Sequence, residues 1–202
     1  MSQLVKNAYA FVNLAMAAFV TSAVAVRFVF PAVSAEGPAF WVVRTAPVRM
    51  SSFLWSKLWT GLVPILLLAE ALTVASNHLL GVAPFLEILG AGAIAFMATA
   101  LVGLACGMGA RHPRFAAENV TQVAGSYGGV AFMVLAVLYI LAMVALLAWP
   151  ASQYLWHEYR ALPIAPGQQL LMALSIAAAA ALSLVVFRRS MRRGVRALEE
   201  LG

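Results

Sequence analysis

Five long apolar stretches run through the sequence, and they constrain the fold more than any other feature. They cover residues 8–26, 58–80, 88–110, 129–149 and 170–187. A transmembrane α-helix needs about 20 predominantly apolar residues to cross the hydrocarbon core of a bilayer. The lengths of the stretches therefore predict an all-α fold, a polytopic membrane bundle of about five transmembrane helices. We expect residues 1–202 to form a single transmembrane domain.

The composition agrees with a membrane environment. Hydrophobic residues make up 64% of the chain and charged residues 10%, whereas a soluble domain carries about 25% charged residues. A charge at the centre of a bilayer costs about 2.5 kcal/mol or more, which explains the low content. Only one cation, Lys6, precedes the first stretch, so we expect this stretch to stay in the mature protein rather than to be removed as a signal peptide.

The positions of the basic residues predict an orientation. All of the 13 Lys and Arg residues except Lys6 and Arg160 fall in alternate connections or in the C-terminal tail. Cytoplasmic loops carry such an excess, so we expect a bacterial-type cytoplasmic (inner) membrane with the N-terminus outside and the C-terminus inside. The cytoplasmic parts are then residues 27–57, 111–128 and 188–202. Because the cations lie between apolar runs and not on one aromatic-rich surface, the lipid bilayer is the expected partner and nucleic acid is not.

The connection at residues 27–57 is too long for a simple turn. Three prolines divide it into short pieces: Pro31, Pro38 and Pro47. Between them lies one apolar patch, Phe40–Val43, with Glu36 before it and Arg44 after it. This pattern predicts a short amphipathic helix in the cytoplasmic interface, with its aromatic residues among the lipid headgroups. A simple interfacial elbow remains the alternative.

Two segments of the chain resemble ABC-2-type permeases of the ABC exporter family. The first matches at Phe30, Pro31, Ser34, Glu36, Gly37, Phe40, Trp41, Arg44, Pro47 and Lys57. The second matches at Pro113, Phe115, Glu118, Asn119, Gly128 and Gly129. It departs from the family pattern at Arg114, where an acid is expected, and at Val120, where a proline is usual. The resemblance covers about residues 25–200, the C-terminal part of a typical member, so we expect a longer N-terminal portion to be absent.

The resemblance implies a permease subunit of an ABC-type exporter, which moves an unidentified substrate with energy from a separate ATPase. The implied partners are a cytoplasmic nucleotide-binding ATPase and a second permease chain, either a copy of this chain or a longer one. By the same resemblance, six residues would contact the ATPase: Glu36, Gly37, Trp41, Arg44, Glu118 and Asn119. ATP and magnesium would then be bound by the partner.

The residues themselves indicate no catalytic site. The sequence has no G-x-x-x-x-G-K-[ST] loop to hold phosphates and no Asp to help hold magnesium. We therefore expect no cofactor, metal site or enzymatic activity in this chain. Three histidines are scattered over the connections: His78, His112 and His157. The single cysteine, Cys106, lies within an apolar stretch, where a helix contact is its expected role.

Glu70 is the one acid near the middle of a predicted transmembrane helix. An ionisable group at that depth is a candidate for function, as a proton relay or a substrate contact. An interhelical hydrogen bond is the structural alternative. Two other readings of the whole chain therefore stay open: a non-transporting scaffold or accessory subunit that retains the permease fold, and an ion-coupled carrier that uses Glu70.

Glycines at four-residue spacing predict close helix packing. The pairs are Gly103 with Gly107 and Gly125 with Gly129. This spacing places small residues on one face of a helix and lets two backbones approach each other. The motif does not distinguish packing within the chain from packing between subunits.

Overall fold

The computed structural model describes residues 3–117, 119–160 and 165–200, without the side chains of residues 3, 4, 7, 158 and 159. Its long helices are α1 (Gln3–Phe28), α3 (Met50–Leu80), α4 (Pro84–Arg111), α6 (Tyr127–Arg160) and α7 (Pro166–Glu200). Its short helices are η1 (Phe30–Ala32), η2 (Ser34–Ala39), α2 (Phe40–Thr45) and α5 (Val120–Ala124). The described residues contain no strand, which confirms the all-α prediction.

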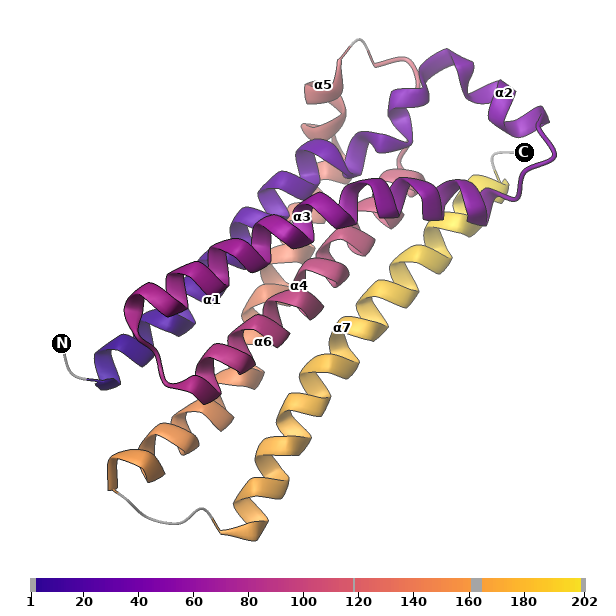
Figure 1. Cartoon of the computed structure of the whole chain (residues 1–202). Helices are drawn as coiled ribbons and strands as arrows, with labels where there is room; N and C mark the ends of the chain where they lie inside the picture. Colours follow the sequence, from indigo (N-terminus) through magenta and orange to yellow (C-terminus); the bar gives the residue numbers. More distant parts are fainter. Residues whose placement is uncertain (1–2, 118, 161–164, 201–202) are drawn as a thin grey trace.

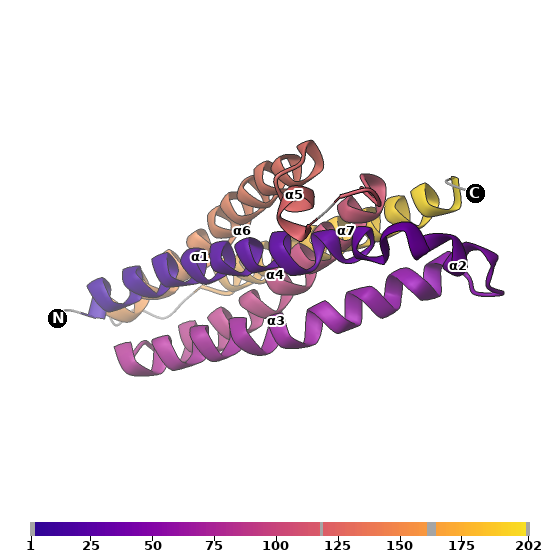
Figure 2. The same cartoon turned by 90° about the horizontal axis from the view of Figure 1, so that it is seen from above.

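The five long helices contain segments that are long and apolar enough to cross a membrane. They run alternately up and down the molecule, so that the short helices α2 and α5 and the C-terminal end of α7 gather at one end (Figure 1). The N-terminal end of α1 and the turn between α3 and α4 lie at the opposite end (Figures 1 and 2). The chain is therefore a membrane protein with an elongated bundle that carries its short helices at one end.

Helix α4 forms the centre of this bundle. Helices α1, α3, α6 and α7 all pack against it, and its residues from Leu101 to Ala110 are all buried. Glycine, alanine and cysteine occupy many of these positions, which lets the neighbouring backbones come close. The neighbouring helices keep large apolar side chains exposed on their outer faces, as a bilayer-facing surface requires. The core thus surrounds α4.

The turn between α3 and α4 has a clear local cause. Gly81 has a φ of 61° and a ψ of 52°, and its N–H bonds to the carbonyls of Asn77 and His78. A glycine in this left-handed conformation ends a helix without the steric cost that a side chain would bring. Pro84 then starts α4, at a position where a missing N–H leaves no hydrogen bond unmade. Together they reverse the chain within a few residues.

The helices extend beyond the apolar stretches that predicted them. Helix α3 begins at Met50, within the predicted connection, and α7 continues through the predicted tail to Glu200. Hydropathy records which residues favour lipid, whereas a helix continues as long as its backbone bonds and packing hold. In the tail, Met191, Gly194 and Leu198 are buried on one face and keep α7 packed beyond its apolar part. The predicted short helix between the first two spans is present as α2.

Candidate functional site

The two connections that the sequence singled out meet at the same end of the bundle. We call residues 30–49 and 112–126 together the end cap. The ring of Phe40 stacks on that of Phe115, with centroids 4.5 Å apart and planes 17° apart, and lies 6.0 Å from the ring of Phe53 in α3. Offset aromatic pairs of this kind stabilise beyond the area that they bury. The end cap is therefore one packed unit built from two distant segments.

Backbone contacts complete the end cap. The backbone N–H of Arg114 donates to Ser34 Oγ over 3.0 Å, and Ser34 is buried. The Phe30 carbonyl lies so close to Gly109 that a Cβ at position 109 would collide with it. The Phe30 ring is fully buried and contacts that of Phe132 with centroids 6.3 Å apart. These contacts fix η1 against α4 and α6.

Two of the predicted contact residues hold the end cap in shape. The Glu36 carboxylate forms an ion pair with the Lys57 ammonium of α3, and both side chains are a little over one quarter exposed. The next residue, Gly37, has a φ of 56° and a ψ of −143° inside η2, a conformation that is essentially restricted to glycine. The Glu36–Lys57 pair and the Gly37 kink therefore set the direction in which α2 leaves the bundle.

The outer face of α2 is free. Trp41 is 64% exposed and Val42 is 49% exposed, while Phe40 on the opposite face is buried. Arg44 and Thr45 are also exposed. Tryptophan and arginine are both enriched among the residues that contribute most to binding at protein interfaces. This face of α2 can thus bind another molecule without unfolding the end cap.

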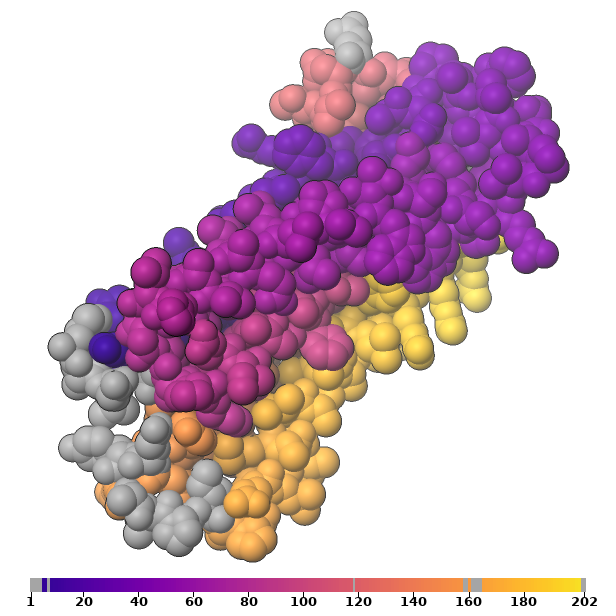
Figure 3. All heavy atoms as spheres, in the orientation of Figure 1, coloured from indigo at the N-terminus to yellow at the C-terminus, as the bar shows by residue number. Residues whose placement is uncertain are grey.

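The end that carries the cap is strongly basic. Its exposed arginines are Arg27, Arg44, Arg49, Arg111, Arg114, Arg188, Arg189, Arg192, Arg193 and Arg196. None of them forms a salt bridge with an acid in the described part of the chain. Side chains of the C-terminal end of α7, shown in yellow in Figure 3, project away from the molecule. This end is therefore suited to contact acidic groups.

The second predicted segment has a more local role. The Asn119 side chain accepts a hydrogen bond of 2.9 Å from the backbone N–H of Gln122 and so caps α5. Val123 is buried and attaches α5 to the core. Glu118, which the resemblance also indicated, lies outside the described residues.

The two glycine pairs differ in their surroundings. Gly103 faces the Phe187 ring, and Gly107 lies against the backbone of Ser190, so both are at the contact of α4 with α7. Gly125 instead ends α5, and the nearest neighbour of Gly129 is the carbonyl of Ala124 in the same turn. The first pair therefore lies where two long helices meet, whereas the second shapes the turn into α6 and does not form a face between long helices.

Glu70 is half-buried in α3. Its carboxylate has no hydrogen bond and no salt bridge with the residues that the structure describes. None of the described residues therefore serves Glu70 as a proton-relay neighbour or as an interhelical hydrogen-bond partner.

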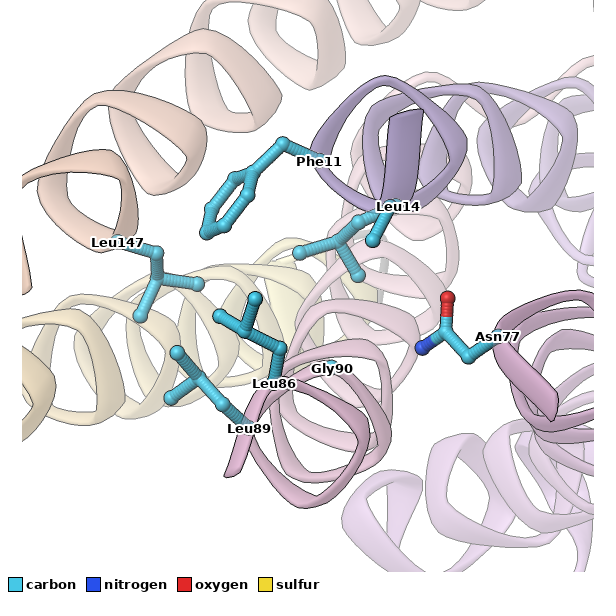
Figure 4. A pocket seen from close by; sticks show the side chains of 8 residues that line it. Phe11, Leu14, Asn77, Leu86, Leu89, Gly90 and Leu147 are labelled. Carbon is cyan, nitrogen blue, oxygen red and sulfur yellow. The ribbon is translucent and has the colours of Figure 1, made fainter. Parts of the chain in front are cut away.

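A small cavity at the other end of the bundle was not foreseen. It measures about 10 Å³ and lies between α1, α3, α4 and α6. Figure 4 shows the Asn77 amide reaching from α3 toward Leu14 and Gly90, with apolar side chains around the rest of the cavity. Asn77 Oδ1 and the nearby Thr73 hydroxyl are buried and make no hydrogen bond in the described part of the chain. The cavity has about the volume of one water molecule.

Among the residues described, no three metal-ligating side chains lie together.

An all-helical bundle with five apolar helices and a basic, folded end cap defines a class, the polytopic membrane proteins. A family model described as "Putative ATP-binding cassette" matches residues 1–202. The chain belongs to this family. No curated protein and no solved structure matches it.

The family match corrects two predictions about identity and role. The matching family is described as an ATP-binding cassette and not as an ABC-2-type permease, so the predicted membership of the permease family is wrong. The predicted role as a permease subunit of an exporter, together with its scaffold alternative, is contradicted by the same match. The resemblance rested on a few short motifs of Pro, Gly and aromatic residues, and these residue types are enriched in membrane helices and at their interfaces in general.

The match also corrects two expected absences. An ATP-binding cassette family is one that binds and hydrolyses ATP, so the expectations of no cofactor and no enzymatic activity in this chain are contradicted. Those expectations depended on the missing phosphate loop and the missing Asp. The absence of these two features excludes one known arrangement of nucleotide-binding groups and does not exclude nucleotide binding in general.

The residues in the described structure do not fit ATP in the arrangement known for such proteins. A phosphate loop surrounds the triphosphate with backbone N–H groups and a lysine, and a hydroxyl binds magnesium. The grooves of about 330, 410 and 550 Å³ on this bundle are lined mainly by apolar side chains, with Lys57 the one cation among their lining residues. A triphosphate would remain largely uncompensated in any of these three grooves.

Proposed function

We propose that this chain is the membrane-embedded component of an ATP-binding cassette assembly and that its end cap binds a nucleotide-binding partner subunit. The observation that carries the proposal is the packing of two distant connections into one cap that presents Trp41 and Arg44 outward. The family supplies the link to ATP. In this assembly the chain forms one transmembrane domain, which associates with a second membrane chain.

The basic end faces the cytoplasm in this proposal, because cytoplasmic segments carry the excess of Lys and Arg. The nucleotide is found in the same compartment. The membrane is then a cytoplasmic (inner) membrane, with the N-terminus outside. Of the residues indicated by sequence, Trp41 and Arg44 contact the partner, whereas Glu36, Gly37 and Asn119 keep the end cap in shape.

Purification of the tagged full chain from its native membranes in a mild detergent tests the proposal. We expect an ATP-hydrolysing protein to co-purify and Trp41→Ala to reduce its recovery about tenfold or more, because a central interface tryptophan contributes about 2 kcal/mol or more to binding. Trp156→Ala is the matched control, since Trp156 is 54% exposed and belongs to the last turns of α6, the end of this helix that lies away from the end cap. Equal recovery with both variants, or no nucleotide-binding protein at all, would show the proposal to be wrong.

A further inference from the structure

A groove between α1 and α3 opens on the outside of the bundle. We call it the α1–α3 groove; its walls include Val24, Phe28 and Ala32 on one side and Thr60, Pro64 and Leu68 on the other. Its volume is about 550 Å³, within the range of ordinary ligand sites. Phe28 is 72% exposed and Leu68 is 43% exposed, so apolar side chains at this level of the bundle face the bilayer.

The shape of the α1–α3 groove follows from two residues of α3. A Cβ at Gly61 would lie 2.6 Å from Val29 Cγ2, so the helices approach closely at that point and the groove has a floor. Pro64 lies inside α3 and has no N–H to donate to the carbonyl of Thr60. Gly61 and Pro64 both line the groove, so its α3 wall includes the turn in which the Thr60 carbonyl receives no hydrogen bond from position 64.

One end of the α1–α3 groove carries opposite charges. Lys57 lines the groove beside Ala35, and its ammonium pairs with the Glu36 carboxylate of η2. The Lys57 and Glu36 side chains remain 27% and 29% exposed, so each charged group can still contact a bound ligand. An apolar channel that ends in a cation beside an anion matches a lipid tail that ends in a phosphate beside an ammonium group.

We propose that the α1–α3 groove is a binding site for a zwitterionic phospholipid of the phosphatidylethanolamine type. One acyl chain occupies the apolar walls, the phosphate contacts Lys57, and the ammonium contacts Glu36. Charge-assisted hydrogen bonds at both ends of the headgroup stabilise this arrangement. An anionic lipid fits less well, because its headgroup has no cation to offset the Glu36 carboxylate. A helix of another protein would bury the Glu36–Lys57 pair and incur its desolvation cost.

A second groove of the same bundle provides an internal control. It lies between α1 and α6, measures about 410 Å³ and is lined by residues such as Val12, Met16 and Leu141, without a charged side chain. This α1–α6 groove offers a lipid chain a comparable apolar surface but nothing for a headgroup. We therefore expect lipids there to exchange like those of the bulk bilayer.

Native mass spectrometry of the full chain tests the site, independently of the proposed function. The detergent-purified chain is mixed with phosphatidylethanolamine and phosphatidylglycerol of identical acyl chains in equal amounts. We expect one phosphatidylethanolamine to be retained preferentially, and Lys57→Met to lower its retention about tenfold, the effect of losing one charge-assisted hydrogen bond. Glu36→Gln should reverse the preference toward phosphatidylglycerol.

Lys57→Met and Glu36→Gln could disturb the end cap itself, so two further variants test the groove by filling it with a large side chain. Thr60→Trp fills the α1–α3 groove from an exposed position and should abolish preferential retention, whereas Met16→Trp in the α1–α6 groove should leave it unchanged. Thermal unfolding of each variant shows that it is folded. Equal retention of the two lipids by the unaltered chain, or unchanged selectivity in both Thr60→Trp and Glu36→Gln, would overturn the proposal.

Discussion

At the scale of single residues, the end cap depends on the backbone of Gly37. A φ of 56° with a ψ of −143° is accessible to glycine because it has no Cβ. A side chain at this position would be strained even though the nearest atom, the Phe115 carbonyl, would lie 3.8 Å from a Cβ. The strain would come from the backbone and not from crowding.

We therefore expect Gly37→Ala to lower the free energy of unfolding by about 1–3 kcal/mol. Thermal unfolding in detergent measures the change. Gly92→Ala is the matched control, since Gly92 lies within α4 and no atom comes within 4 Å of an added Cβ. That control should be neutral or stabilising, by up to about 1 kcal/mol. A Gly37→Ala melting temperature equal to that of the unaltered chain would contradict the argument.

The buried Thr73 hydroxyl supports a second prediction at this scale. It is fully buried and has no hydrogen-bond partner in the described part of the chain. A buried group without a partner costs about 1–3 kcal/mol, so Thr73→Val, which keeps the shape, should raise stability by about 1 kcal/mol. Thr99→Val should not stabilise, because the Thr99 hydroxyl donates to the Ala95 carbonyl over 2.8 Å. Chemical denaturation of both variants distinguishes the two cases.

At the scale of helices, the contact of α4 with α7 depends on small residues from both sides. Gly107 faces the backbone of Ser190, and a Cβ on Gly194 would lie 2.9 Å from the Gly107 Cα. The two backbones are therefore nearly in contact. Hydrogen bonds add to the attachment of α7, since Ser183 Oγ lies 2.7 Å from the Tyr139 hydroxyl of α6 and Ser175 Oγ donates to the Leu146 carbonyl over 2.6 Å.

We expect Gly107→Ala to destabilise the bundle by about 1–3 kcal/mol, because the added methyl group forces α7 away from α4. Gly167→Ala, at the start of α7, meets no atom within 4 Å and should have little effect. Unfolding by increasing amounts of a denaturing detergent compares the two variants. Equal stability would show that α7 can move aside at no cost.

The apolar helices could be predicted from the sequence, and the end cap could not. Each apolar stretch reports its own preference for lipid, so α1, α3, α4, α6 and α7 were all foreseen as elements. The contact of Ser34 with Arg114 joins residues 80 positions apart, and nothing in the spacing of either segment indicates the other. The pairing of Glu36 with Lys57 was missed for the same reason. The cavity beside Asn77 was missed because hydropathy averages over a window in which one amide has little weight.

At the scale of the whole molecule, the basic residues divide the bundle into two unlike ends. The arginines of the end-cap side are exposed, whereas Lys6 and Arg160 belong to the opposite end. A membrane that favours cations on its cytoplasmic side would hold the bundle in one orientation. The end cap and the C-terminal part of α7 would then face the same compartment.

Thiol labelling measures this orientation. Replacing the buried Cys106 with Ala gives a chain without cysteine, in which single cysteines are introduced at Gln168 or Arg193. We expect an impermeant thiol reagent to label Gln168→Cys in intact cells, and Arg193→Cys after the membrane has been permeabilised. The reverse pattern would contradict the proposed orientation.

Helix α7 gives the molecule a mechanical property. Its 35 residues correspond to about 52 Å at 1.5 Å per residue, and its one proline stands at the first position, whereas α3 and α6 carry Pro64 and Pro150 inside. A helix without an internal proline lacks the usual point of bending. Helix α7 is packed against α4 near the end cap and continues to the far end of the bundle. A force on its arginine-bearing C-terminal end would therefore tilt the whole helix and displace its N-terminal end on the other side of the membrane.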